Sequence, residues 1–182
     1  PGIEPGPNPY VSLTIYNYPV PDEPEYGIVT AVEASYNGVV GEYTLGYGID
    51  QESAIFISQE TNGQPKYPCQ TEYYRLGPQV SARCTHQGYT FVEFKGASIG
   101  PAEPLPEFDH NEFWIKVSRA ASVGGPATAY DFPPHVVQVR SRYGTAWREE
   151  VKGELVLRDS PWDPLTTLLP MQEQVSAHLW WP

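Results

Sequence analysis

One lysine of this chain lies in a sequence context that suits covalent chemistry. Lys66 ends the turn Asn62-Gly63-Gln64-Pro65-Lys66, between a predicted helix and a predicted hairpin. A rigid turn can aim the amine inward, and an amine in apolar surroundings loses part of its charge. A neutral amine can attack a ketone carbonyl and form a Schiff base. Such a turn is also typical of a solvated loop corner, so the rest of the chain has to decide between the two interpretations.

Further polar side chains could complete a site around the lysine. Glu42 suits a general acid or base, although a lone glutamate at a hairpin end is also typical of a solvated surface. Asn62 and Gln64 flank Lys66 and can hydrogen-bond a substrate oxygen, but both residue types also form turns. The side chains predicted to bind substrate are Tyr43, Asn62, Gln64 and Tyr67.

Composition favours a mainly β protein. The 182 residues are expected to form one domain, residues 1–182. A chain of this length can bury about 70% of its unfolded surface, and 40% hydrophobic residues support a core. The 20 prolines and 16 glycines mark many turns, while 13 tyrosines and 5 tryptophans are typical of strands.

Charge limits the partners that this chain can bind. A formal net charge of -11 argues against nucleic acid and against anionic membranes, since both require a basic face. No apolar run approaches the roughly 18 residues of a membrane span, and no signal-peptide pattern is visible. The expectation is a cytoplasmic protein that acts on a small molecule, without metal or cofactor. A homo-oligomer remains open.

Alternating apolar and polar residues predict about nine strands. The Asn37-Gly38 pair is a strong hairpin signal between two of them. Residues 96–111 and 123–134 are rich in proline or other breakers and are expected to be loops. The predicted strands cover residues 10–18, 26–36, 41–49, 70–75, 79–85, 89–95, 113–119, 136–143 and 150–158.

A single short helix is predicted over residues 51–61. Asp50 is expected to cap its start, and Asn62-Gly63 its end. The apolar residues that should face the core are Ala54, Ile55 and Ile57. Nine strands with one helix predict a mainly β (α+β) fold, a closed antiparallel barrel or cone that leaves no exposed edge.

Two cysteines flank a predicted hairpin turn. Cys69 and Cys84 are equally distant from its centre between Leu76 and Gly77, so their side chains should lie opposite each other. A disulfide is possible at that separation, but free thiols are the favoured interpretation. Neither cysteine has a histidine at metal-ligand spacing, which argues against zinc.

Five motifs resemble one known family by their order along the chain. They are Pro1-Gly2-Ile3-Glu4-Pro5, Glu60-Thr61-Asn62-Gly63-Gln64-Pro65-Lys66, Val80-Ser81-Ala82-Arg83 with Gly88, Trp162-Asp163-Pro164-Leu165 with Leu169-Pro170, and Val175-Ser176-Ala177-His178. Together they resemble the acetoacetate decarboxylase superfamily, in which the last motif would form the final core strand. The resemblance implies a β barrel or cone around a deep apolar pocket. It also implies a cofactor-independent imine at Lys66 that serves as the electron sink for loss of carbon dioxide.

The chain departs from the family pattern in three places. Tyr67 stands where decarboxylases of the family commonly have a second lysine. Ile28 aligns with a catalytically linked glutamate, whose place Glu25 or Glu33 would take in another register. The family's first strand, with its arginine, would precede Pro1. These departures favour a broader Schiff-base lyase, which acts on a keto acid or a larger, polyketide-like keto substrate by decarboxylation or by aldol, dehydration or cyclisation chemistry.

A second interpretation keeps the barrel but not the covalent chemistry. The chain would then bind a ligand non-covalently or act as a cyclase-type template, because a fold does not fix a function. The two interpretations differ in whether Lys66 is buried and faces the substrate.

Overall fold

Strands make up most of the chain in the computed structural model, which describes residues 2–19, 24–120 and 130–181. Two helices accompany them, α1 (Glu52–Asn62) and α2 (Leu165–Leu168). The strands are β1 (Ile3–Pro5), β2 (Val11–Tyr18), β3 (Glu25–Tyr36), β4 (Val39–Ile49), β5 (Lys66–Pro68), β6 (Gln70–Leu76), β7 (Gln79–His86), β8 (Tyr89–Leu105), β9 (Phe108–Lys116), β10 (His135–Tyr143), β11 (Ala146–Leu157) and β12 (His178–Trp181).

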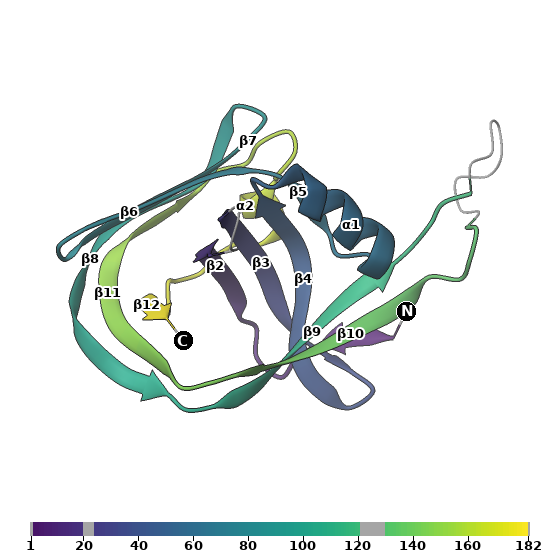
Figure 1. The fold of residues 1–182 in the computed structure, drawn as a ribbon, viewed down its shortest axis with the longest axis horizontal. Helices are drawn as coiled ribbons and strands as arrows, with labels where there is room; N and C mark the ends of the chain where they lie inside the picture. Colours follow the sequence, from purple (N-terminus) through teal and green to yellow (C-terminus); the bar gives the residue numbers. More distant parts are fainter. Residues whose placement is uncertain (1, 20–23, 121–129, 182) are drawn as a thin grey trace.

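These strands form two sheets that together curl into a half-barrel (Figure 1). The seven-stranded sheet has the order β1-β3-β4-β9-β10, with β2 beside β3 and β5 beside β4. The five-stranded sheet has the order β12-β11-β8-β7-β6. Most pairs are antiparallel, but β5 and β9 lie parallel to β4. The mainly β fold class is confirmed; the described strands exceed nine because β1, β5 and β12 are too short to show alternation.

The β3–β4 hairpin confirms the Asn37-Gly38 prediction and sets the register of the seven-stranded sheet. Asn37 and Gly38 have positive φ angles of 50° and 78°, as a tight hairpin turn requires. Further along, Thr30 lies opposite Gly46 and Ala31 opposite Thr44, so Leu45 is an extra residue in β4. This bulge moves the side-chain alternation by one residue. Thr44 and Tyr47 therefore lie on the same face of the sheet.

Helix α1 matches the predicted span within one residue, but two details of the prediction are wrong. Asp50 does not cap the helix, because its carboxylate accepts the backbone N–H of Tyr26 at 2.9 Å. Ile55 is the buried residue of α1, whereas Ile57 is 66% exposed. The helix packs against the short β5 and the end of β9, so it covers only a narrow strip. The helix ends at Gly63, as predicted.

Two predicted segments differ from the structure. Most of residues 96–111 belong to β8 and β9 instead of a loop, because β8 pairs with β11 as far as Leu105 through two register shifts that accommodate its prolines. Residues 175–178 do not form the final core strand. Val175 is 67% exposed, and pairing with β11 begins only at His178. Of the predicted loop 123–134, residues 123–129 lie outside the described residues.

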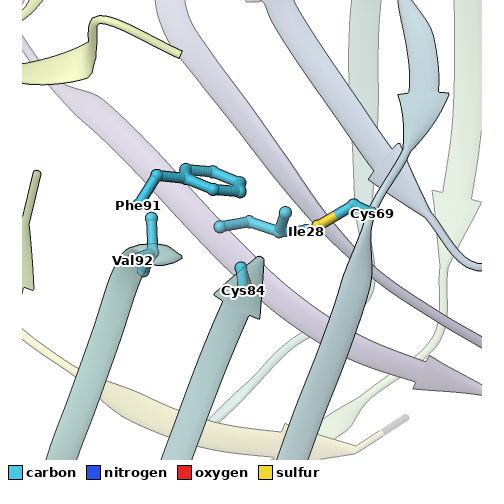
Figure 2. Close-up of a cluster of buried hydrophobic side chains, with 5 residues drawn as sticks. All are labelled: Ile28, Cys69, Cys84, Phe91 and Val92. Carbon is cyan, nitrogen blue, oxygen red and sulfur yellow. The ribbon is translucent and has the colours of Figure 1, made fainter. Parts of the chain in front are cut away.

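The main core joins the two sheets (Figure 2). Ile28 of β3 packs against Phe91 and Val92 of β8, and against Cys69 and Cys84. Both cysteines are free and buried, as favoured. Cys84 lies opposite Thr71 rather than Cys69, because the β6–β7 turn is centred one residue later than predicted. The Thr71 hydroxyl lies 3.7 Å from the Cys69 sulfur and 3.8 Å from the Cys84 sulfur, and so bridges the two thiols.

Neither helix of the described part has the length and apolarity needed to cross a membrane.

Gly63 is expected to be intolerant of any side chain. Its φ is +67°, and an added Cβ would lie 2.6 Å from the Lys116 Cα. Gly38 provides a matched control, since its φ is +78° but a Cβ there meets open space. Both alanine variants should lose about 1–2 kcal/mol from the left-handed backbone, and Gly63→Ala should lose about 1–3 kcal/mol more from the clash. Urea unfolding measures the difference; equal losses would contradict the packing described here.

Candidate active site

The turn after α1 delivers Lys66 directly into the seven-stranded sheet. The backbone N–H of Lys66 donates to the Gln64 carbonyl at 2.7 Å, and its own carbonyl accepts the Gln59 side chain at 2.5 Å. Lys66 then lies beside Tyr47 in the parallel β4–β5 pair. The Tyr47 N–H donates to the Pro65 carbonyl at 3.0 Å. Backbone bonds on both sides therefore fix where the lysine side chain begins.

The Lys66 amine lies over an aromatic ring in partly buried surroundings. Its Nζ is 5.0 Å from the centroid of the Tyr47 ring. Burial lowers the pKa of Lys66 because it penalises the ammonium form, while the negative charge of Glu25 acts in the opposite direction. Burial is the larger of the two effects. The amine is therefore easier to deprotonate than an ordinary lysine.

Tyr47 belongs to a group of three polar side chains from three strands. The Tyr16 hydroxyl of β2 donates to the Glu25 carboxylate of β3. The rings of Tyr16 and Tyr47 meet edge to face with centroids 5.8 Å apart. Burial raises the pKa of Tyr47 to about 12 and also raises that of Tyr16. Both phenols are thus neutral donors close to the lysine.

Glu42 lies on the same face of the sheet as this group, but further along β4. Its carboxylate accepts the Ser12 hydroxyl at 2.8 Å and lies 3.5 Å from His110 Nε2. Four residues of β4 lie between Glu42 and Tyr47, the residue beside Lys66. The structure therefore places Glu42 in a second polar cluster and not in contact with the amine.

The four residues predicted to bind substrate do not lie together on one face of the sheet. Tyr67 is opposite Gly48 and packs against the hydrophobic core, on the face away from Lys66. Tyr43 pairs with Phe113, also on that other face. Asn62 ends α1, and the buried Gln64 lies in the turn before Lys66. A substrate role for these four side chains remains a prediction, which the geometry favours least for Tyr67 and Tyr43.

Three residues near the amine lay outside the predicted site: Tyr16, Tyr47 and Glu25. Glu25 was one of two alternatives for the family's glutamate, and the other, Glu33, accepts the backbone N–H of Asn8 at 2.7 Å. Ile28, at the aligned position, is fully buried in the core. The period-two pattern places Tyr16 and Tyr47 on strands, but only the pairing of β2, β3 and β4 brings them together.

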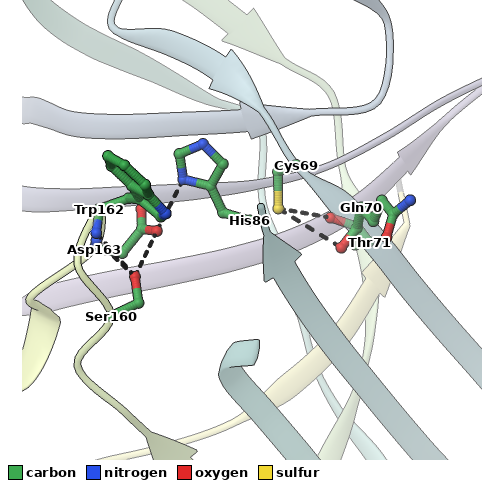
Figure 3. Close-up of polar contacts among 7 residues, drawn as sticks. All are labelled: Cys69, Gln70, Thr71, His86, Ser160, Trp162 and Asp163. Atoms are coloured by element: carbon green, nitrogen blue, oxygen red, sulfur yellow. Dashed lines mark hydrogen bonds and ion pairs between the residues drawn. The ribbon is translucent and has the colours of Figure 1, made fainter. Parts of the chain in front are cut away.

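A histidine, an aspartate and a serine meet on the core side of the structure (Figure 3). His86 Nδ1 lies 2.9 Å from Asp163 Oδ2, and the Ser160 hydroxyl donates to the same oxygen at 3.2 Å. In a nucleophilic triad the serine would bond to the histidine. Here it bonds to the aspartate and accepts the Asp163 N–H at 2.9 Å. The cluster therefore anchors the segment before α2 to β7.

Within the residues that the structure describes, no group of three or more histidine, cysteine, aspartate or glutamate side chains could hold a metal ion.

The chain belongs to the acetoacetate decarboxylase family. The family model described as acetoacetate decarboxylase (ADC) matches residues 1–182. No curated protein sequence matches the chain. Membership of the family indicates a lyase-type enzyme.

Solved structures share the fold at low sequence identity. Acetoacetate decarboxylase from Legionella pneumophila has a TM-score of 0.70 at 15% identity, over 98% of this chain and 71% of that one. The enduracididine biosynthesis enzyme MppR has a TM-score of 0.63 at 16% identity, over 88% and 68%. An acetoacetate decarboxylase-like enzyme from Sphingomonas wittichii has a TM-score of 0.65 at 13% identity, over 86% and 64%. The chain thus spans roughly two thirds of the length of these proteins.

Glu25→Gln should move the reactivity of Lys66 to lower pH. The negative charge of Glu25 stabilises the ammonium form, so its removal lowers the pKa of the lysine further. The pH dependence of Lys66 modification by an amine reagent, followed by peptide mass, measures this change. Glu33→Gln on the same strand is the matched control and should leave the profile in place. A shift to higher pH in Glu25→Gln would contradict the electrostatic link.

Proposed function

We propose that this protein is a Schiff-base-forming lyase that acts on a keto acid or a larger keto compound through Lys66. The proposal rests above all on one observation: the Lys66 amine lies partly buried over the Tyr47 ring, and burial lowers the pKa of this amine. A neutral amine of this kind is the nucleophile that imine formation requires. The Tyr16, Tyr47 and Glu25 side chains provide hydrogen-bond donors and a carboxylate beside it.

The proposed reaction begins with attack of the amine on the keto carbon. The carbonyl oxygen gains negative charge and takes a proton, for which the neutral Tyr47 hydroxyl is our candidate donor. The proton that the nitrogen loses as the carbinolamine forms then restores the phenol. Loss of water then gives a protonated imine. The electron pair of the breaking carbon–carbon or carbon–hydrogen bond flows into that imine and leaves an enamine. Protonation and hydrolysis of the enamine release the product, and the lysine supplies the electron sink without a cofactor.

The same imine supports several outcomes. Loss of carbon dioxide, aldol addition, dehydration and cyclisation all pass through the enamine. The residue that follows Lys66 is Tyr67, which packs against the core, and not a second lysine. One relative, MppR, was solved in complex with the condensation product of pyruvate and imidazole 4-carboxaldehyde. That complex supports chemistry other than plain decarboxylation on this fold, and we extend the proposal to such reactions.

A non-covalent role is the second candidate, and the position of the amine over Tyr47 is the observation that favours it. A charged ammonium about 5 Å from a ring centroid is also a cation–π pair, worth about 0.5–1 kcal/mol at an exposed site. In that case Lys66 would remain charged and would order the binding surface. The protein would then bind or fold a keto ligand as a template.

Lys66→Arg separates the two functions. Arginine keeps the positive charge but provides no amine that can form an imine. We expect borohydride trapping of a keto acid panel, read as intact mass, to disappear and turnover to fall more than about a thousandfold. Lys95→Arg on the exposed side of β8 is the control and should keep both. Near-normal turnover by Lys66→Arg would show that the imine mechanism is wrong and that the template role replaces it.

Lys116 is not a suitable control for that experiment. Its Nζ donates to the Gln59 and Glu60 carbonyls at 2.9 and 2.6 Å, at the end of α1. Replacing it would disturb the turn that carries Lys66.

A further inference from the structure

A second polar cluster lies on the face of the sheet that carries Lys66. Glu42 of β4 and Glu112 of β9 are side by side because they are paired residues of these two parallel strands. The Trp114 indole N–H donates to the Thr44 hydroxyl at 3.2 Å. The Thr44 hydroxyl in turn donates to Glu112 Oε1 at 3.5 Å. The position of Glu112 is thus set by its neighbours on two strands.

The two carboxyl groups have different surroundings. Glu42 has the Ser12 hydroxyl and the His110 ring as partners, and its side chain is 32% exposed. Burial raises the pKa of Glu112, and the negative charge of Glu42 adds to this, while His110 and Thr44 act in the opposite direction. A hydroxyl group can bond to such a carboxyl group in either protonation state, because a hydroxyl both donates and accepts. Glu42 beside it accepts the Ser12 hydroxyl.

The cluster and the Lys66 amine lie beside the same face of β4, at two points along the strand. Thr44 and Tyr47 share a face because Leu45 is the bulged residue. Three residues of extended strand span roughly 10 Å. The negative charge of Glu112 also acts to raise the pKa of Tyr47, the residue beside Lys66. A ligand bound at Lys66 would have to be extended to reach Glu112.

We propose that Glu112, with Glu42 and His110 beside it, is a second recognition point of the same site, which binds a neutral oxygen at the far end of an extended keto substrate. This inference rests on the proposed function of Lys66 and names its substrate class. The far group would be a hydroxyl, which can donate to the Glu112 carboxylate or accept from its protonated form. A carboxylate there would meet the negative charge of Glu42 and would be disfavoured.

One aromatic side chain lies between the cluster and Tyr47. Trp114 of β9 borders Thr44 and is 5% exposed. Its ring adds apolar surface without adding charge, which suits a carbon chain that joins two oxygen functions.

A matched series of ketones tests the inference. Each methyl ketone, in increasing chain length, is compared in three forms, ending in a hydroxyl, a methyl group or a carboxylate. The readout is the ratio of borohydride-trapped protein within each set, by intact mass. At one chain length we expect the hydroxyl form to be trapped about three- to tenfold more than the methyl form, as one net hydrogen bond predicts. The carboxylate form should be trapped least. A ratio near one at every length would overturn the inference.

Variants at Glu112 assign the preference to its carboxyl group. Glu112→Leu should bring the hydroxyl-to-methyl ratio close to one, whereas Glu112→Gln keeps an N–H donor and should retain part of it. Glu72→Gln, in an exposed ion pair with Arg83 on the other sheet, is the control and should keep the full ratio. An unchanged ratio in Glu112→Leu overturns the inference, as does an equal loss of all three forms, which would indicate a structural role.

The same comparison on Lys66→Arg separates this inference from the proposed function. That variant cannot form an imine, so equilibrium binding of the ketone set reports recognition alone. If the wild type traps no ketone, the lyase proposal fails. In that case the second recognition point is still supported if Lys66→Arg binds the hydroxyl form preferentially and the double variant, which also carries Glu112→Leu, does not. Absence of the preference in Lys66→Arg overturns it.

Discussion

The parallel pairing of β4 with the three residues of β5 is the constraint on which the site depends. It begins where Gly63 allows the chain to pass within contact of the Lys116 backbone. Since side chains alternate along a strand, placing Lys66 beside Tyr47 forces Tyr67 to the opposite face. One short strand therefore divides adjacent residues between a polar face and the hydrophobic core. A shift of one residue would exchange them and remove the amine from the site.

The two faces of the seven-stranded sheet carry different kinds of side chain. The core face buries Ile28, Phe91 and Val92 and holds the two sheets together (Figure 2). The polar face holds tyrosines and carboxylates from four strands, each with a partner. At Lys66 the cost of desolvating the ammonium outweighs the attraction of Glu25. This balance lowers the pKa of Lys66 without a second cation beside it. Under the proposed function, a tyrosine at position 67 is therefore compatible with a neutral amine.

Local sequence signals predicted the elements of this fold well, and they failed where distant pairing decides. The Asn37-Gly38 turn, the helix end at Gly63 and most of the strands follow from neighbouring residues. The prolines of β8 suggested a loop, but pairing with β11 holds them in a strand. The turn with Lys66 was predicted, whereas its neighbours Tyr16 and Tyr47 were not, and Glu25 was only one of two alternatives. Each belongs to a different strand, so only the assembled sheet and its bulge at Leu45 bring them together.

The protonation of Lys66 is the property that most directly tests this account. Side-chain NMR of lysines labelled with carbon-13, with Lys66 assigned by its loss in Lys66→Arg, follows the amine through a pH titration. Lys152, which is exposed on β11, gives the reference in the same spectra. The account predicts that Lys66 titrates at clearly lower pH than Lys152, because burial disfavours its charged form. Titration of Lys66 together with Lys152, or at higher pH, would contradict a neutral nucleophile at this position.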